Sequence, residues 1–196
     1  MSALELALRR VAHLLSDAGV PFALVGGLAV SVRVEPRFTR DADLAVGVAS
    51  DAEAEAVIAR LVAAGCRVVA TVEQIATGRL ATVRLVVGAT ADAPVVDLLF
   101  ASSGIEAEVV NDAETLAILA GVRLPVATTA HLIAMKLLSR DDERRPQDLV
   151  DLRALVGQAT AVDLARARES TDLITARGCH RGRNLADELE RLVPCA

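Results

Sequence analysis

The feature that most constrains the fold is a short apolar run that leads directly into two glycines. Residues 22–25 have the length and composition of a buried strand, and Gly26-Gly27 follow at once. Residues 28–34 then contain no helix breaker before Pro36, which favours a helix. The segment therefore predicts a strand, a tight turn and a helix. Backbone N–H groups at such a helix start can bind an anion.

The rest of the chain divides into a strand-rich part and a helical part. Apolar runs bounded by turn residues predict strands at 42–48, 67–71, 80–87 and 95–100, and shorter extended pieces at 108–110, 115–119 and 123–126. Helical spacing predicts helices at 4–15, 52–64, 129–139, 146–156, 162–169 and 185–192. We expect an α+β fold, with a mixed β-sheet and flanking helices in residues 1–127 and a C-terminal helical region, residues 128–196, that closes the cleft.

Composition favours a self-sufficient cytoplasmic domain. The chain has 196 residues, enough to bury a core without disulfides or structural metals. Its longest uncharged apolar stretch near the start, residues 20–32, contains two glycines and a proline and is too short to span a membrane. Residues 1–17 carry charges at helical spacing, which predicts an amphipathic helix instead of a signal peptide. Cys66, Cys179 and Cys195 have no metal-ligand spacing, so we expect reduced, inert thiols.

Charge and aromatic content limit the partners. A net charge of −5 argues against an indiscriminate nucleic-acid binder, and no DNA partner is expected. Two arginine clusters, residues 177–183 and the pair Arg144 and Arg145, are candidate local phosphate sites, although each could equally be a solvated loop. Aromatic residues make up only 2% of the chain, which argues against a base-stacking platform.

Three aspartates form the candidate catalytic centre. Asp41 and Asp43 are two residues apart on a predicted strand, so both side chains point to the same face. Hard oxygen ligands of this kind suit Mg²⁺ or Mn²⁺ together with substrate phosphates. Asp97 lies within an otherwise apolar strand, where an unpaired carboxylate is costly, and is a candidate third metal ligand. A structural alternative is that Asp97 pairs with Arg84.

These residues can have separate roles in a phosphoryl-type transfer. Gly26 and Gly27 allow phosphate oxygens to approach the backbone N–H groups closely. Asp41 and Asp43 would hold an ion that bridges a triphosphate, and Asp97 would place a second ion or act as a base in a two-metal displacement. Arg40 is a candidate phosphate ligand, but it could equally neutralise the acids beside it.

The pattern resembles a known family. Residues 25–30 and 37–44 resemble the AbiEii-type nucleotidyltransferase toxins of bacterial toxin–antitoxin systems, including the mycobacterial MenT group, within the DNA polymerase β-like superfamily. The resemblance continues at residues 134–140 and 147–152, and so covers roughly residues 25–155. It implies a nucleotidyltransferase fold, an NTP substrate, a divalent metal and a cognate protein antitoxin.

The resemblance also implies roles for residues on two predicted helices. Lys136 would be a nucleotide-binding or catalytic residue, and Asp151 the late essential aspartate, with Asp148 as the alternative. Gln147 departs from the basic residue that many relatives have there. The residues themselves place Lys136 and Arg140 four apart beside an apolar stripe, where both could reach across a cleft to nucleotide phosphates. They could also simply complement the helix C-terminus.

The nucleotide acceptor is implied by the resemblance and has two alternatives. The resemblance implies the 3′ acceptor end of tRNA, with a pyrimidine nucleotide such as CTP as donor, and a block of translation as the consequence. An antibiotic-type small-molecule transferase and a non-catalytic nucleotide-binding module are the alternatives. Thr39 lies two residues before Asp41, so a phosphate on it would add about −1.5 to −2 charges beside the metal site. We therefore predict that modification of Thr39 inactivates the enzyme.

Overall fold

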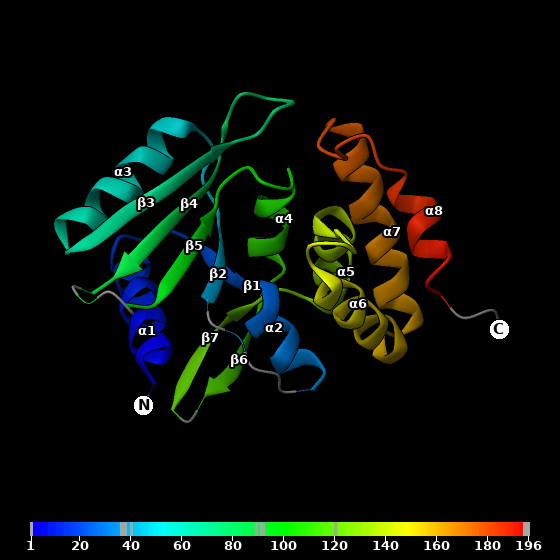
Figure 1. The fold of residues 1–196 in the computed structure, drawn as a ribbon, viewed down its shortest axis with the longest axis horizontal. Coiled ribbons are helices and arrows are strands. Elements are labelled where there is room, and N and C mark those ends of the chain that lie inside the picture. Colours follow the sequence, from blue (N-terminus) through cyan, green and yellow to red (C-terminus); the bar gives the residue numbers. More distant parts are fainter. Residues whose placement is uncertain are drawn as a thin grey trace.

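The computed structural model describes residues 2–35, 39, 41–88, 90, 93–119 and 121–193. They form a seven-stranded sheet in the order β3-β4-β5-β2-β1-β7-β6 (Figure 1). The strands are β1 Phe22–Val25, β2 Asp41–Val46, β3 Cys66–Glu73, β4 Leu80–Val87, β5 Val95–Leu99, β6 Glu114–Leu119 and β7 Val122–Val126. The helices are α1 Ala3–Asp17, α2 Gly26–Arg33, α3 Asp51–Ala63, α4 Glu106–Asn111, α5 Thr129–Ser139, α6 Pro146–Gln158, α7 Ala161–Ala176 and α8 Leu185–Glu190.

The sheet is mixed, and its register aligns the polar side chains of the site. Strand β2 pairs antiparallel with β1 and parallel with β5, whereas β4 pairs antiparallel with β5. Asp43 on β2 lies opposite Asp97 on β5, and Asp97 lies opposite Arg84 on β4. Neighbouring strands are about 4.8 Å apart. The three side chains therefore form one row across three adjacent strands.

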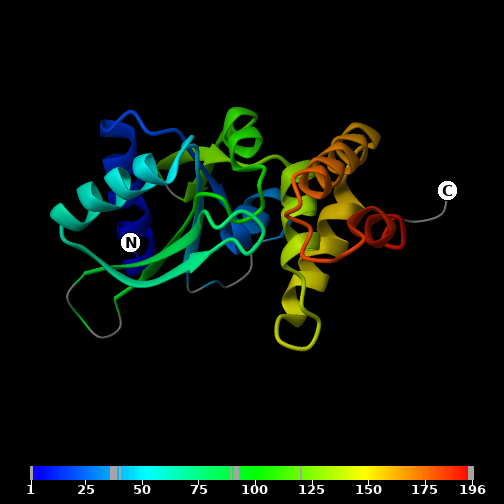
Figure 2. The same ribbon diagram turned by 90° about the horizontal axis from the view of Figure 1, so that it is seen from above.

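The helices form two groups. Figures 1 and 2 show α1 and α3 with the sheet, while α5 to α8 form a separate layer on the other side of α2. Helix α5 contacts α6, α7 and α8, and it also contacts α2, so it joins the helical layer to the sheet. Ile133 and Leu137 of α5 are fully buried, as are Leu44 and Leu98 of the sheet. One continuous apolar core thus holds the two sides of the cleft together.

Most predicted elements are present, with small shifts at their ends. The predicted strand at 42–48 begins one residue earlier, at Asp41, and the helix predicted at 162–169 continues to Ala176. The helix predicted after the glycines begins at Gly26 itself. The mixed sheet with flanking helices and the later helical region confirm the expected fold class. The boundary at residues 127 and 128 stays a prediction.

The prediction of an extended piece at 108–110 was wrong. These residues belong to helix α4. The cause is Glu106, which is only 4% exposed and whose carboxylate accepts hydrogen bonds from the Ser103 N–H at 2.6 Å and the Gly104 N–H at 2.9 Å. These bonds fix the start of the helix, and β-branched Val109 packs beneath it. Propensity favoured a strand, but local hydrogen bonding and burial outweigh it.

The high mean hydropathy of +0.43 reflects the valine- and leucine-rich sheet and core. In the part of the chain that the structure describes, no helix is both long and apolar enough to cross a bilayer. Cys66 and Cys179 are free and buried, and burial raises the pKa of both thiols. Thiols of this kind are poor nucleophiles. Cys195 lies outside the described residues.

Candidate active site

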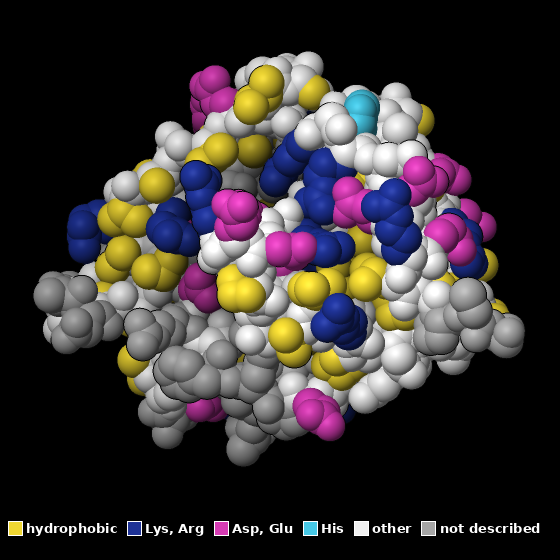
Figure 3. All heavy atoms as spheres, turned by 45° about the vertical axis from the view of Figure 1, so that its right-hand side comes forward, with side chains coloured by type: hydrophobic (Ala, Val, Ile, Leu, Met, Phe, Trp, Pro, Cys, Tyr) yellow, Lys and Arg dark blue, Asp and Glu magenta, His cyan; other side chains and the backbone are white. Residues whose placement is uncertain are grey.

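A cleft of about 1160 Å³ lies between the sheet and the helical layer. Figure 3 shows Lys and Arg side chains gathered on this face of the molecule, interspersed with acidic ones. Strands β2, β4 and β5 and the start of α2 supply the floor. Helix α5, the start of α6 and the turn after α7 supply the opposite wall. The cleft therefore brings together the early glycine–carboxylate motif and the late lysine–aspartate motif.

Asp41 and Asp43 lie side by side on the floor. Both line the cleft, whereas Ala42 between them is fully buried on the other face of β2. The Thr39 hydroxyl lies 3.2 Å from Asp41 Oδ1 and 3.1 Å from its carbonyl oxygen. The alternation predicted from the Asp-x-Asp spacing is therefore present, and Thr39 lies directly against the first carboxylate.

Only glycine fits at position 26, because its backbone lies against the Asp43 carboxylate. Its φ of +66° is unfavourable for residues with a side chain, and a Cβ built there would lie 1.9 Å from Asp43 Oδ2. Because Val25 pairs with Asp43 across β1 and β2, the turn that follows places the start of α2 against this carboxylate. Gly27 also lines the cleft. The glycine pair thus provides close approach both for Asp43 and for an anion at the helix start.

The electrostatics of Asp43 fit a cation site. Burial raises the pKa of Asp43 from 3.8 to about 7, and the neighbouring Asp41 and Asp97 add to this, while Lys136 and Arg145 oppose it. Among the described residues, none donates a hydrogen bond to the Asp43 carboxylate. A divalent cation between Asp41 and Asp43 would relieve both the burial cost and the repulsion. The residues present therefore fit a metal with hard oxygen ligands.

Asp97 is placed differently from the expectation of a third metal ligand. Its Oδ1 accepts from Arg84 Nε at 2.9 Å and its Oδ2 from Arg84 Nη2 at 2.7 Å. Asp97 raises the pKa of Arg84 further above its usual range through these bonds. Within the described part of the chain, no three acidic, histidine or cysteine side chains converge on one point. The structural alternative, pairing with Arg84, is the arrangement present.

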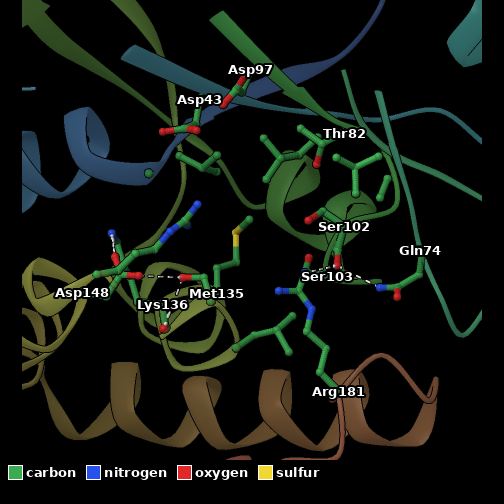
Figure 4. A pocket seen from close by; sticks show the side chains of 18 of the residues that line it. Asp43, Gln74, Thr82, Asp97, Ser102, Ser103, Met135, Lys136, Asp148 and Arg181 are labelled. Atoms are coloured by element: carbon green, nitrogen blue, oxygen red, sulfur yellow. Dashed lines mark hydrogen bonds and ion pairs between the residues drawn. The ribbon is translucent and has the colours of Figure 1, made fainter. Parts of the chain in front are cut away.

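Lys136 is held between two aspartates of the neighbouring helix. Its Nζ lies 2.5 Å from Asp148 Oδ1 and 2.9 Å from Asp151 Oδ2, and the three side chains are 11%, 8% and 2% exposed. Lys136 and Asp148 line the cleft, whereas Asp151 lies behind them and also accepts from Gln147 Nε2 at 3.2 Å. Figure 4 shows Lys136 and Asp148 across the cavity from Asp43 and Asp97. Asp151 thus positions Lys136, and Gln147 positions Asp151.

This buried pairing gives a stability prediction. Replacing Lys136 by Met removes the cation that Asp148 and Asp151 share, and we expect a loss of about 3–5 kcal/mol of unfolding free energy. Arg168→Met is a matched control, because Arg168 pairs with Glu190 on the surface, where both side chains are largely exposed. That control should cost less than about 1 kcal/mol. Urea unfolding of both variants measures the difference, and equal losses would contradict the assignment.

One predicted phosphate ligand, Arg140, does not line the cleft. The Arg140 guanidinium turns away from it and bonds Asp142, with Nε to Oδ1 at 2.6 Å, in a surface hollow near Arg183 and Glu188. Arg140 is the cap residue that follows α5 and its φ and ψ are not helical, so helical spacing from Lys136 no longer determines its direction. Arg40 lies outside the described residues.

The wall also contains one arginine from each of the two clusters that the sequence predicts as candidate local phosphate sites. Arg145 and Arg181 line the cleft, and among the described residues neither guanidinium meets a carboxylate. Arg181 Nη2 donates to the Ser102 carbonyl at 3.2 Å (Figure 4). By contrast, their neighbours Arg177 and Arg183 are neutralised by glutamates. The sequence shows the clusters, but only the fold shows which members lack a counter-charge.

The turn that carries Arg181 is firmly held. Arg181 has a φ of 54°, and Gly178 and Gly182 on either side of it also have positive φ. Cys179 is buried against Gly104, and Arg177 bonds both the Gly104 carbonyl and Glu108. A left-handed non-glycine residue costs free energy that the surrounding contacts must offset. The arginine is thus kept at the cleft by contacts on both sides of it.

Together, the mixed sheet, the glycine turn, the paired aspartates and the facing lysine define a nucleotidyltransferase. Residues 9–194 match the family described as nucleotidyl transferase AbiEii toxin, type IV TA system, and the chain belongs to this family. The protein is therefore a nucleotidyltransferase of a toxin–antitoxin family. This membership implies an NTP substrate, an antitoxin partner and, typically, a divalent metal.

Solved structures of low sequence identity share the fold. An antigenic nucleotidyltransferase-like protein from Paracoccidioides brasiliensis is 17% identical, with a TM-score of 0.58 over 98% of this chain and 94% of that one. The antibiotic-resistance factor ANT(2″)-Ia is 18% identical, with a TM-score of 0.57 over 94% of this chain and 95% of that one. The lincosamide antibiotic adenylyltransferase LnuA is 15% identical, with a TM-score of 0.50 over 77% and 95%. None of the curated proteins matches the sequence significantly.

Proposed function

We propose that this enzyme is a toxin that transfers nucleotides from an NTP, with CTP or another pyrimidine nucleotide as donor, to the 3′ acceptor end of tRNA and so blocks translation. The observation that supports tRNA as the acceptor is the pair Arg145 and Arg181. These two guanidiniums lack carboxylate partners among the described residues and face an acidic catalytic floor. In a chain of net charge −5, two arginines without a carboxylate partner on the wall of the cleft suit a polyanionic acceptor.

The chemistry follows from the two sides of the cleft. Asp41 and Asp43 would hold Mg²⁺ or Mn²⁺, which supplies Lewis-acid stabilisation of the transferred phosphoryl group when bound. The backbone N–H groups at Gly26 and Gly27 would bind phosphate oxygens of the NTP. Lys136 would donate its third N–H, which Asp148 and Asp151 leave free, to a triphosphate oxygen from the opposite wall. Because Asp148 and Asp151 fix the position of its ammonium group, little reorganisation is needed when the nucleotide binds.

Label transfer tests this function directly. The protein is incubated with magnesium, total tRNA and each of the four labelled NTPs in turn, and also with hydroxyl-bearing antibiotics in place of tRNA. We expect label on tRNA from a pyrimidine NTP and no label with Asp41→Ala. Label on the antibiotic alone would establish the small-molecule alternative. No transfer to RNA with any NTP would overturn the proposal.

Salt dependence tests the role of the two arginines. Each contact with a phosphate in a single strand contributes about 0.7 to the slope of log affinity against log salt. Arg145→Ala and Arg181→Ala should each weaken tRNA binding about five- to tenfold and flatten this slope by about 0.7. Arg144→Ala is the matched control, because Arg144 is exposed and does not line the cleft. An equal effect of the control would show that tRNA binding depends on the overall charge of the chain and not on Arg145 and Arg181.

Thr39 is the proposed point of regulation. Its hydroxyl lies 3.2 Å from Asp41 Oδ1, so a phosphate there would add about −1.5 to −2 charges directly against the metal-binding pair. We expect Thr39→Glu to lower transfer about 100-fold or more, whereas Thr39→Gln, of the same size without charge, should retain most of it. Initial rates of label transfer measure both variants. Full activity of Thr39→Glu would exclude this regulation.

A further inference from the structure

We propose that the site binds a single divalent ion, at Asp41 and Asp43, and that the Arg84 guanidinium supplies the second positive charge by contacting a phosphate oxygen of the substrate. Arg84 is thereby a further catalytic residue, and Asp97 is the residue that positions it. The inference rests on the proposed transferase function and specifies the composition of its charged centre.

The register of the sheet provides the geometry. Asp43, Asp97 and Arg84 lie opposite one another on β2, β5 and β4, so the guanidinium occupies the next position in the row after the two carboxylates. Both oxygens of Asp97 are engaged, at 2.9 Å and 2.7 Å, in a bidentate pair. The carboxylate that would complete a second ion site is therefore already occupied by a cation of this chain.

The exposure of the two side chains shows which of them can reach a substrate. The Asp97 side chain is 9% exposed and the Arg84 side chain is 46% exposed, and both line the cleft. A guanidinium has more N–H donors than a carboxylate can accept, so Arg84 keeps donors for a second anion after bonding Asp97. A buried acid that holds an accessible arginine in a fixed direction is the arrangement expected for a pre-organised phosphate ligand.

The charge balance also favours one ion. Arg84 neutralises Asp97, so the floor retains the two negative charges of Asp41 and Asp43, which one divalent ion matches. A second ion at Asp97 would have to displace a bidentate guanidinium and would leave that positive charge beside two metal ions. Like charges at such short range disfavour this state strongly. A permanently charged arginine thus replaces an exchangeable ion.

Metal stoichiometry tests the inference. The full chain is saturated with a non-hydrolysable α,β-methylene NTP and titrated with Mn²⁺, free Mn²⁺ is counted by electron paramagnetic resonance, and the uptake by the unbound nucleotide, measured without protein, is subtracted. We expect one Mn²⁺ per chain in the wild type and two in Arg84→Gln, where Asp97 is released. Arg84→Gln with Asp97→Asn should return to one. Arg84→Lys keeps a positive charge and should also bind one.

Arg79→Gln is the matched control, because Arg79 directly precedes β4, pairs with Asp51 and does not line the cleft. It should bind one ion, like the wild type. Two ions in the wild type, or one ion in a folded Arg84→Gln variant, would overturn the inference. Circular dichroism verifies that each variant is folded. No Mn²⁺ in the nucleotide complex would instead contradict the proposed metal-dependent function, so the two failures are distinguishable.

Discussion

Gly26→Ala is expected to lower the rate of nucleotide transfer about 100-fold or more. The added methyl group would lie 1.9 Å from Asp43 Oδ2, so the carboxylate must move away from the position at which it holds the metal. A displacement of about 1 Å in a reacting centre can cost about two orders of magnitude in rate. Rates of label transfer at saturating metal measure the effect.

Gly19→Ala separates this effect from backbone strain. Gly19 has a φ of +65°, almost the same as the +66° of Gly26, but a Cβ there meets nothing within 4 Å. Both variants should lose about 1–2 kcal/mol of unfolding free energy from the left-handed conformation. Only Gly26→Ala should lose activity. Equal rates in the two variants would show that Gly26 serves the turn and not the carboxylate.

Asp43→Asn is expected to abolish transfer and, in metal-free protein, to raise the melting temperature. Burial and the neighbouring acids raise the pKa of Asp43 to about 7 from 3.8, so between these values the folded state binds a proton that the unfolded state has released. Stability therefore falls as pH rises from about 4 to about 7, and the full cost is present above pH 7. The asparagine side chain carries no charge and avoids this cost.

Thermal unfolding in the presence of a chelator, at pH 8 and at pH 4.5, compares the melting temperatures of Asp43→Asn and the wild type. After allowance for solvent screening, the variant should melt about 5 °C higher than the wild type at pH 8 and nearly equally at pH 4.5. Asp172→Asn, at an exposed position on α7, should show no such pH-dependent gain. A lower melting temperature for Asp43→Asn at pH 8 would mean that the carboxylate is already compensated without metal.

Local pattern was sufficient to predict the first half of the site. Because strand residues two apart share a face, the spacing of Asp41 and Asp43 alone predicts that both reach the cleft, and the structure places them there. The glycine pair between strand and helix is equally local. Lys136 came from the family resemblance, and helical spacing agreed with its place at the cleft.

The remainder depends on contacts that no local pattern encodes. Whether Asp97 faces a metal or Arg84 depends on the register of β4 against β5, and the sequence left both open. Arg140 lies four residues after Lys136, but the helix ends there and Asp142 captures its guanidinium. Arg181 lines the cleft without a glutamate partner, whereas Arg177 pairs with Glu108 of α4 and Arg183 with Glu188 of α8.

Analysis of the tRNA 3′ end tests the central claim most directly. Intact tRNA and tRNA whose 3′-terminal diol has been destroyed by periodate are incubated with the enzyme, magnesium and CTP, and their masses are compared by mass spectrometry. The proposed function predicts a mass increase of one or more whole nucleotides on intact tRNA, none on oxidised tRNA and none with Asp41→Ala. Unchanged intact tRNA, or equal addition to oxidised tRNA, would contradict transfer to the acceptor end.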